Sequence, residues 1–164
     1  MKPIVLFLLI FCMWSINPAQ EKKILNILNR ELKKEVKNQF KSRLFNGDTI
    51  SIVKEFSIDQ EKKLSFEIMV KSPYVTGTQF IKQDVPLQKL KKLGKDIQII
   101  LEAEEDSVIT TVANSEADEK VRISKSNLFY LSMSSEQNNE KLGEELQNAF
   151  KKAGYPLIKE YWAD

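Results

Sequence analysis

The sequence predicts an α+β domain, in which a mainly antiparallel sheet of five to six strands carries an N-terminal and a C-terminal helix on one face. Two patterns lead to this prediction. Near both ends of the chain, apolar residues recur at three- and four-residue steps, which is typical of amphipathic helices. Between them, apolar and polar residues alternate, as in strands of a sheet with one face in water.

The first nineteen residues have the layout of a secretory signal peptide. Lys2 precedes an apolar run over residues 4–14, and small, turn-forming residues follow it up to Ala19. A membrane anchor would need ~20 apolar residues, about twice the length of this run. We therefore predict cleavage after Ala19, or a residue or two away because Asn17 fits such a site poorly. Residues 20–164 are then one α+β domain, exported to the periplasm or secreted.

Two residue types are missing from the predicted mature chain, and their absence excludes much chemistry. The single cysteine, Cys12, lies inside the apolar run, and the bulky Phe11 before it disfavours lipid attachment. Without a thiol, disulfides, thiol catalysis and cysteine metal sites are excluded. Without histidine, Ser-His-Asp relays and His-based zinc sites are excluded as well. We predict no metal and no cofactor.

Charge is balanced, with 25 basic and 23 acidic residues dispersed among one another. Such a chain has no long-range field to attract nucleic acid or an anionic membrane. None of the five glycines belongs to a phosphate-binding loop. We predict no nucleic-acid partner and no stable membrane anchor once the signal is removed.

The N-terminal half is predicted to be a helix followed by a hairpin. The helix covers residues 21–42, and its buried stripe is formed by Leu25, Leu28, Leu32, Val36 and Phe40. A turn at residues 46–48 ends it. Strands at residues 50–58 and 64–71 then alternate without a break in the second strand, which makes this hairpin the clearest element of the pattern.

The rest of the chain alternates strands, loops and two helices. A loop at residues 72–78 precedes the next strand, and Pro86 is predicted to open a short helix that Gly94 closes. The last helix is predicted over residues 135–153, with Ser134 as its cap. Further strands are predicted at residues 79–84, 97–101, 108–113 and 127–133, with 121–123 as a candidate short strand and 157–162 as an edge strand or a strap over the sheet.

Two groups of aromatic and hydroxyl residues are candidate ligand sites. The loop at residues 72–78 contains Tyr74, Thr76 and Thr78, which could frame a small ligand or a glycan, or which could form a turn with Tyr74 packed over the sheet edge. At the C-terminus, Tyr161 and Trp162, with Tyr155 nearby, are either a contact surface for a partner or the end of the hydrophobic core.

Two groups of acidic residues are predicted to lie in solvated loops and not to form calcium sites. Neither group has the spacing or the glycine of a calcium loop. They are Glu102, Glu104, Glu105 and Asp106, and Glu116, Asp118 and Glu119.

Taken together, these features predict an exported, non-catalytic binding or interaction domain whose partner is a protein, a glycan or a small molecule. The alternative is a small carboxylate-dependent enzyme acting on a glycan. That chemistry needs two carboxyl groups ~5–5.5 Å or ~6.5–9.5 Å apart. Glu55 and Glu67, on the polar face of the predicted hairpin, are the pair that the sequence places together.

Overall fold

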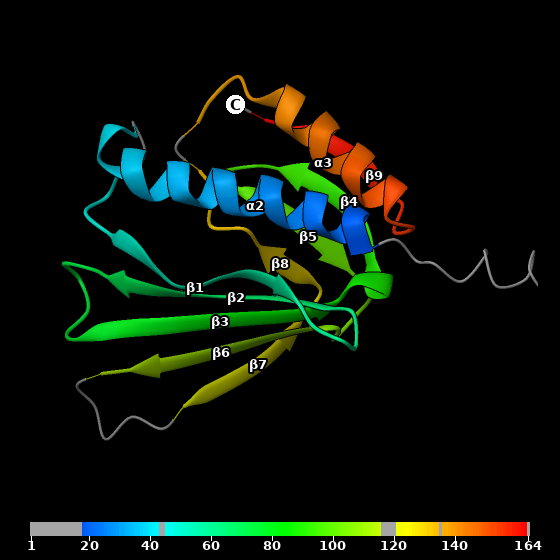
Figure 1. The fold of residues 1–164 in the computed structure, drawn as a ribbon. Coiled ribbons are helices and arrows are strands. Elements are labelled where there is room, and N and C mark those ends of the chain that lie inside the picture. The colour runs from blue at the N-terminus through cyan, green and yellow to red at the C-terminus, as the bar shows by residue number, and fades with distance from the viewer. Residues whose placement is uncertain (1–17, 43–44, 116–120, 135, 164) are drawn as a thin grey trace, which may run out of the picture.

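The predicted α+β class is confirmed. The computed structural model describes residues 18–163 apart from 43–44, 116–120 and 135 (Figure 1). Helices α2 (Pro18–Asn38) and α3 (Glu140–Lys152) pack beside each other on one face of a five-stranded antiparallel sheet. Four further strands form a second sheet, so the predicted strands are divided between two sheets.

The five-stranded sheet has the strand order β1-β2-β3-β6-β7, and each pair of neighbours is antiparallel. The predicted hairpin is its first part. The strands are β1 (Thr49–Ile58), β2 (Lys63–Lys71), β3 (Thr78–Pro86), β6 (Val108–Asn114) and β7 (Arg122–Ser126).

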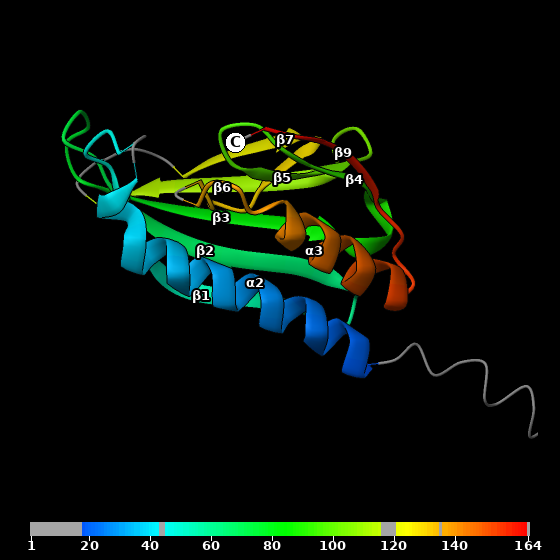
Figure 2. The same ribbon diagram turned by 90° about the horizontal axis from the view of Figure 1, so that it is seen from above.

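The smaller sheet has the order β8-β5-β4-β9 and lies against the α3 side of the molecule (Figure 2). Its strands are β4 (Leu90–Lys95), β5 (Ile99–Ala103), β8 (Leu128–Tyr130) and β9 (Ile158–Trp162). The C-terminal residues therefore form an edge strand, which pairs in parallel with β4.

The prediction of a short helix after Pro86 is wrong. Only a single 3-10 turn, η3 (Leu87–Lys89), is present, and β4 follows it directly. The leucines at residues 87, 90 and 93 are all buried, as predicted, but the three-residue spacing of the last two comes from an irregularity in β4. The pairing with β5 shifts between Leu90 and Lys92, which returns Leu93 to the buried face.

The last helix starts at Glu140, later than predicted. Ser134 does not cap it, because its hydroxyl donates to Glu35 of α2. The segment before the helix is held by the buried Lys95, whose ammonium donates to the carbonyl of Glu136 and to the side chain of Asn139. A long-range polar contact thus replaces the local capping box that the sequence indicated.

The hydrophobic core lies between the two helices and the two sheets. Helix α2 contributes Ile24, Leu28 and Leu32, and β2 contributes Phe66. The predicted stripe of α2 is wrong at its C-terminal end, where Phe40 is 65% exposed. There the helix tightens into a 3-10 turn, η2 (Gln39–Lys41), so the stripe rotates away from the sheet.

Two side-chain amides, one from α2 and one from η2, cover the free edge of β1. Asn29 accepts from the N–H of Phe56 and donates to its carbonyl. Gln39 does the same for Ile50. These amides satisfy backbone groups that an edge strand otherwise leaves open. They also fix the position of the end of α2 above the sheet.

Candidate functional site

An open groove of about 350 Å³ lies between the C-terminal half of α2 and the helix-facing side of the five-stranded sheet. We call it the α2 groove. Its floor is apolar and is formed by Ile50, Ile68, Val70 and Ile81 from the three adjacent strands β1, β2 and β3. Ile50 is paired with Val70, and Ile68 with Ile81, so the four side chains form a compact aliphatic patch.

The walls of the α2 groove are mostly polar. Helix α2 contributes Glu35, η2 contributes Gln39, and the turn before β1 contributes Asn46 and Asp48. Two serines that follow β8 complete the polar part of the walls. Phe45 and Ile97 add apolar surface at the mouth. The groove stays open because α2 ends at Asn38, before it has covered the ends of β2 and β3.

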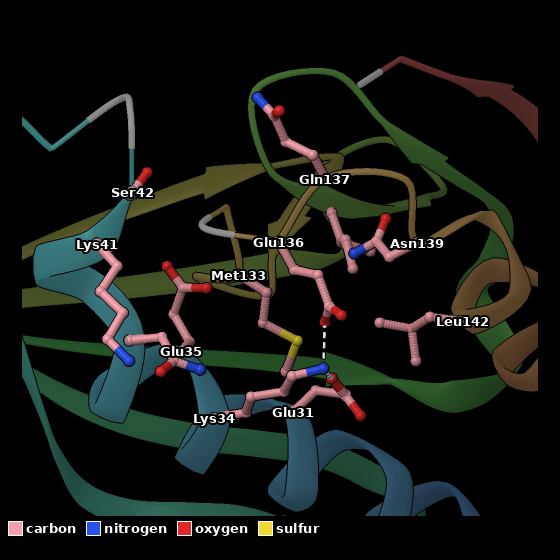
Figure 3. A pocket seen from close by; sticks show the side chains of 12 residues that line it. Glu31, Lys34, Glu35, Lys41, Ser42, Met133, Glu136, Gln137, Asn139 and Leu142 are labelled. Carbon is pink, nitrogen blue, oxygen red and sulfur yellow. Dashed lines mark hydrogen bonds and ion pairs between the residues drawn. The ribbon is translucent and has the colours of Figure 1, made fainter.

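A second cavity, of about 370 Å³, lies beside Glu35, between α2 and the segment leading into α3 (Figure 3). It is lined by charged groups, among them Glu31, Lys34 and Glu136. Lys34 contacts Glu136 at 2.6 Å, and this hydrogen bond is the main reason that the pKa of Lys34 is raised. Glu31 is paired with Arg30 at 2.6 Å. These charges already have partners within the protein, which favours a structural role.

The two carboxylates considered for glycan hydrolysis each form an ion pair with a different lysine. Glu55 contacts Lys33 of α2 at 2.8 Å, whereas Glu67 contacts Lys54 at 3.0 Å. The pairing of β1 with β2 is irregular on both sides of Lys54, which breaks the simple alternation from which the pair was inferred.

The carboxyl groups whose pKa values are shifted also do not favour acid catalysis, because both pKa values are lowered. Hydrogen bonds from Lys89 and then Lys91 lower the pKa of Glu104 to about 2. A hydrogen bond from Arg30 lowers the pKa of Glu145. A general acid working near neutral pH needs its pKa raised instead.

The candidate residues of the loop at 72–78 are largely in solvent. Tyr74 is 78% exposed, so it does not pack over the sheet edge. The carbonyl of Thr76 accepts from Asn114, and the N–H of Thr78 donates to Ser115. These bonds tie the loop to the end of β6 and leave the Tyr74 ring exposed.

The C-terminal aromatic residues behave differently from one another. Trp162 is half-buried, and its indole N–H donates to Asn139 at 2.9 Å. Tyr161 is exposed. Tyr155 donates to Glu21 at 3.0 Å, and burial, together with this bond, raises its pKa to about 12. Trp162 and Tyr155 are thus parts of the packing.

The two groups of candidates do not form one site. Figures 1 and 2 both place the β2–β3 loop and β9 at different ends of the molecule. The predicted residues therefore lie outside the floor of the α2 groove. The floor residues were visible in the sequence as an alternating pattern, but the same pattern describes strands that a helix covers completely.

Two acidic side chains, at the end of β5 and in the turn after it, are paired with lysines. Glu104 is paired with Lys89 and Lys91, and Glu102 with Lys92. No group of three or more acidic side chains suited to a metal ion is present in the described residues. The second acidic group, at residues 116–119, lies outside them.

Comparisons of the chain with protein-family models, with curated proteins and with solved structures find no match. Among the helices of the described part, none is long and apolar enough to cross a membrane. The class of protein is therefore defined by its architecture: an α+β domain of two sheets and two helices, with an open groove that has an aliphatic floor.

Proposed function

We propose that this chain is an exported, non-catalytic binding domain whose α2 groove takes the apolar part of a small ligand. The observation that supports this most is the floor of the groove, where aliphatic side chains from three strands line an open space. Of the four, only Ile68 is fully buried by the protein itself.

The composition of the groove fits a ligand site. Ligand pockets of ~300–1,000 Å³ combine apolar walls with a few polar groups that orient the ligand. Here the aliphatic floor is bordered by amides, hydroxyls and two carboxylates. Covering the floor would remove apolar surface from water, at about 25 cal/mol per Å².

Binding can be tested with the neutral fluorescent probe N-phenyl-1-naphthylamine. We expect the wild-type protein to bind it with a blue-shifted, enhanced emission, and Val70→Glu to weaken binding by at least about tenfold, because a carboxylate in the floor must be desolvated. The matched control is Met69→Glu, at the residue of β2 just before Val70, whose side chain points to the opposite face of the sheet.

Two results would count against the proposal. One is a wild-type protein that leaves the probe emission unchanged. The other is an equal loss of binding in both variants, which would mean that the probe responds to the fold in general and not to the groove. Circular dichroism of each variant checks that it remains folded.

Export is the second part of the proposal, and the N-terminal pattern of charge, apolar run and small residues supports it. The packing of α2 is compatible with a cut after Ala19. Pro18 and Ala19 are exposed, whereas Glu21 is buried and contacts Lys62 at 2.8 Å. Cleavage there would leave the packed part of the helix intact.

We expect the mature protein to begin at or near Gln20. Intact mass measurement of protein recovered from the extracytoplasmic fraction should show the loss of the segment through Ala19 and no lipid on Cys12. An exported, soluble protein that still begins at Met1 would contradict this prediction.

A further inference from the structure

Large apolar side chains gather at the mouth of the α2 groove, on the outside of the protein. Phe40 and Phe45 contact each other edge to face, with ring centroids 5.4 Å apart. Ile97, which lines the same groove as Phe45, is 67% exposed. Tyr74 and Val75 of the β2–β3 loop are exposed as well. We call these five residues the apolar rim.

The β2–β3 loop belongs to this end of the molecule. Gly47, in the turn that follows Phe45, lies so close to the loop that an added Cβ would come within 2.8 Å of Pro73 Cγ. Both views place the loop at the same end of the molecule as the C-terminal end of α2 (Figures 1 and 2). Large exposed apolar patches that are bordered by polar residues mark sites of interaction with proteins or membranes.

Three exposed lysines lie next to rim residues along the chain. Lys37 at the end of α2 and Lys41 in η2 flank Phe40, with Lys41 also lining the second cavity, and Lys71 precedes the β2–β3 loop. All three are exposed, and within the described chain they make no ion pair. On the same helix, α2, Lys33 is instead paired with Glu55 and Lys34 with Glu136. Asp48, in the groove wall, is the acidic group nearest to Lys71 along the paired strands.

We propose that the apolar rim docks on the surface of an anionic lipid bilayer and that the ligand of the α2 groove is an acyl chain exchanged with that bilayer. This rests on the proposed function and names its ligand class. Aromatic and aliphatic side chains enter the boundary between headgroups and acyl chains, and nearby lysines are attracted to anionic headgroups. Balanced charge over the whole chain does not oppose this, since the attraction acts within about a Debye length of the membrane.

The rim and the groove share two apolar side chains, those of Phe45 and Ile97. An acyl chain leaving the bilayer at the rim would pass along these two side chains on its way to the aliphatic floor. A chain that had to cross a polar barrier would lose its hydrophobic stabilisation on the way. The arrangement thus suits exchange with a membrane better than capture of a free polar molecule.

Docking can be tested by flotation with vesicles made of equal parts phosphatidylcholine and phosphatidylglycerol. We expect Phe40→Ser to lower the partition coefficient by about tenfold, the effect of losing one inserted aromatic side chain. The control is Ile123→Ser on β7, whose side chain is 68% exposed but lies away from the rim. All variants carry the same N-terminal segment, so its contribution to binding is common to them.

The charge contribution is tested with Lys41→Glu against Lys125→Glu, an exposed lysine of β7. We expect only the first to reduce flotation several-fold, and the reduction to shrink at high salt or with pure phosphatidylcholine. Equal losses in the two variants, or in Phe40→Ser and Ile123→Ser, would overturn the proposal. A dimer that Phe40→Ser dissociates, without any vesicle binding, would overturn it in favour of a second copy.

Acyl-chain uptake is measured with vesicles containing pyrene-labelled phosphatidylglycerol, whose excimer emission falls as lipid leaves. We expect Val70→Glu to float normally but to extract no lipid, and Phe40→Ser to bind N-phenyl-1-naphthylamine normally but to float poorly. A wild-type protein that does not bind N-phenyl-1-naphthylamine would contradict the proposed function itself. Normal naphthylamine binding without flotation or lipid extraction would overturn only this inference.

Discussion

Replacing Phe66 by alanine is expected to lower the free energy of unfolding by about 3–5 kcal/mol. The side chain is 2% exposed in the middle of β2. Its ring stacks on Phe56, with centroids 4.3 Å apart, and meets Phe129 edge to face at 5.6 Å. Truncation removes buried apolar surface, leaves a cavity and breaks both ring contacts. Each ring contact contributes about 0.5–1.5 kcal/mol in addition to the contribution of the buried apolar area.

Neighbouring positions on β2 provide the controls. Ser65 and Glu67 point to the opposite face of the sheet, so their alanine variants should change stability by roughly 0.5 kcal/mol or less. The urea midpoints of the three variants, compared when their denaturant slopes (m values) are equal, measure these differences in stability. Similar shifts for all three would mean that the two faces of the hairpin are assigned the wrong way round.

The hairpin was predictable because its signal is local. Between Leu64 and Ile68 each apolar residue alternates with a polar one, and the face of a strand is set by that period alone. The spacing at Leu87, Leu90 and Leu93 was misleading because its cause is not local. A bulge in β4 produces a three-residue step that resembles a helix, and a bulge depends on the partner strand.

The groove and its rim were not predictable, because they depend on where one element stops covering another. The repeat in α2 placed Phe40 on the buried stripe, but the amide of Gln39 bonds to Ile50 and the chain tightens there. Glu31 and Glu35 are buried on the same helix although they are charged. Gln39 contacts a distant strand, and Glu35 accepts a hydrogen bond from Ser134, far along the chain.

The tail shows how a local pattern left two readings open. Residues 157–162 were predicted as an edge strand or a strap, and the aromatic residues as a contact surface or as packing. The structure separates the two aromatics by strand alternation: Trp162 faces α3, and Tyr161 faces away from it and is exposed. Close approach is possible because the residue opposite Trp162 is Gly143, where an added Cβ would lie 2.7 Å from the indole ring.

Deleting residues 157–164 is expected to lower the free energy of unfolding by several kcal/mol. The deletion removes the strand that pairs with β4, the buried Leu157 and the contact of Trp162 with α3. Full burial of a large apolar side chain contributes about 1.5–3 kcal/mol, from which the entropy of ordering the tail is subtracted. An unchanged melting temperature would instead assign the tail to partner binding.

A matched pair of point variants keeps this prediction decisive if the deleted protein fails to fold. Trp162→Ala should destabilise clearly more than Tyr161→Ala, because only the indole donates to Asn139 and packs on Gly143. In protein cleaved after Ala19, as proposed, Trp14 is absent and the emission of Trp162 gives an independent measurement. Blue-shifted emission that resists quenching is expected. Red-shifted, freely quenched emission would show that the indole is in water and that β9 is not packed as described.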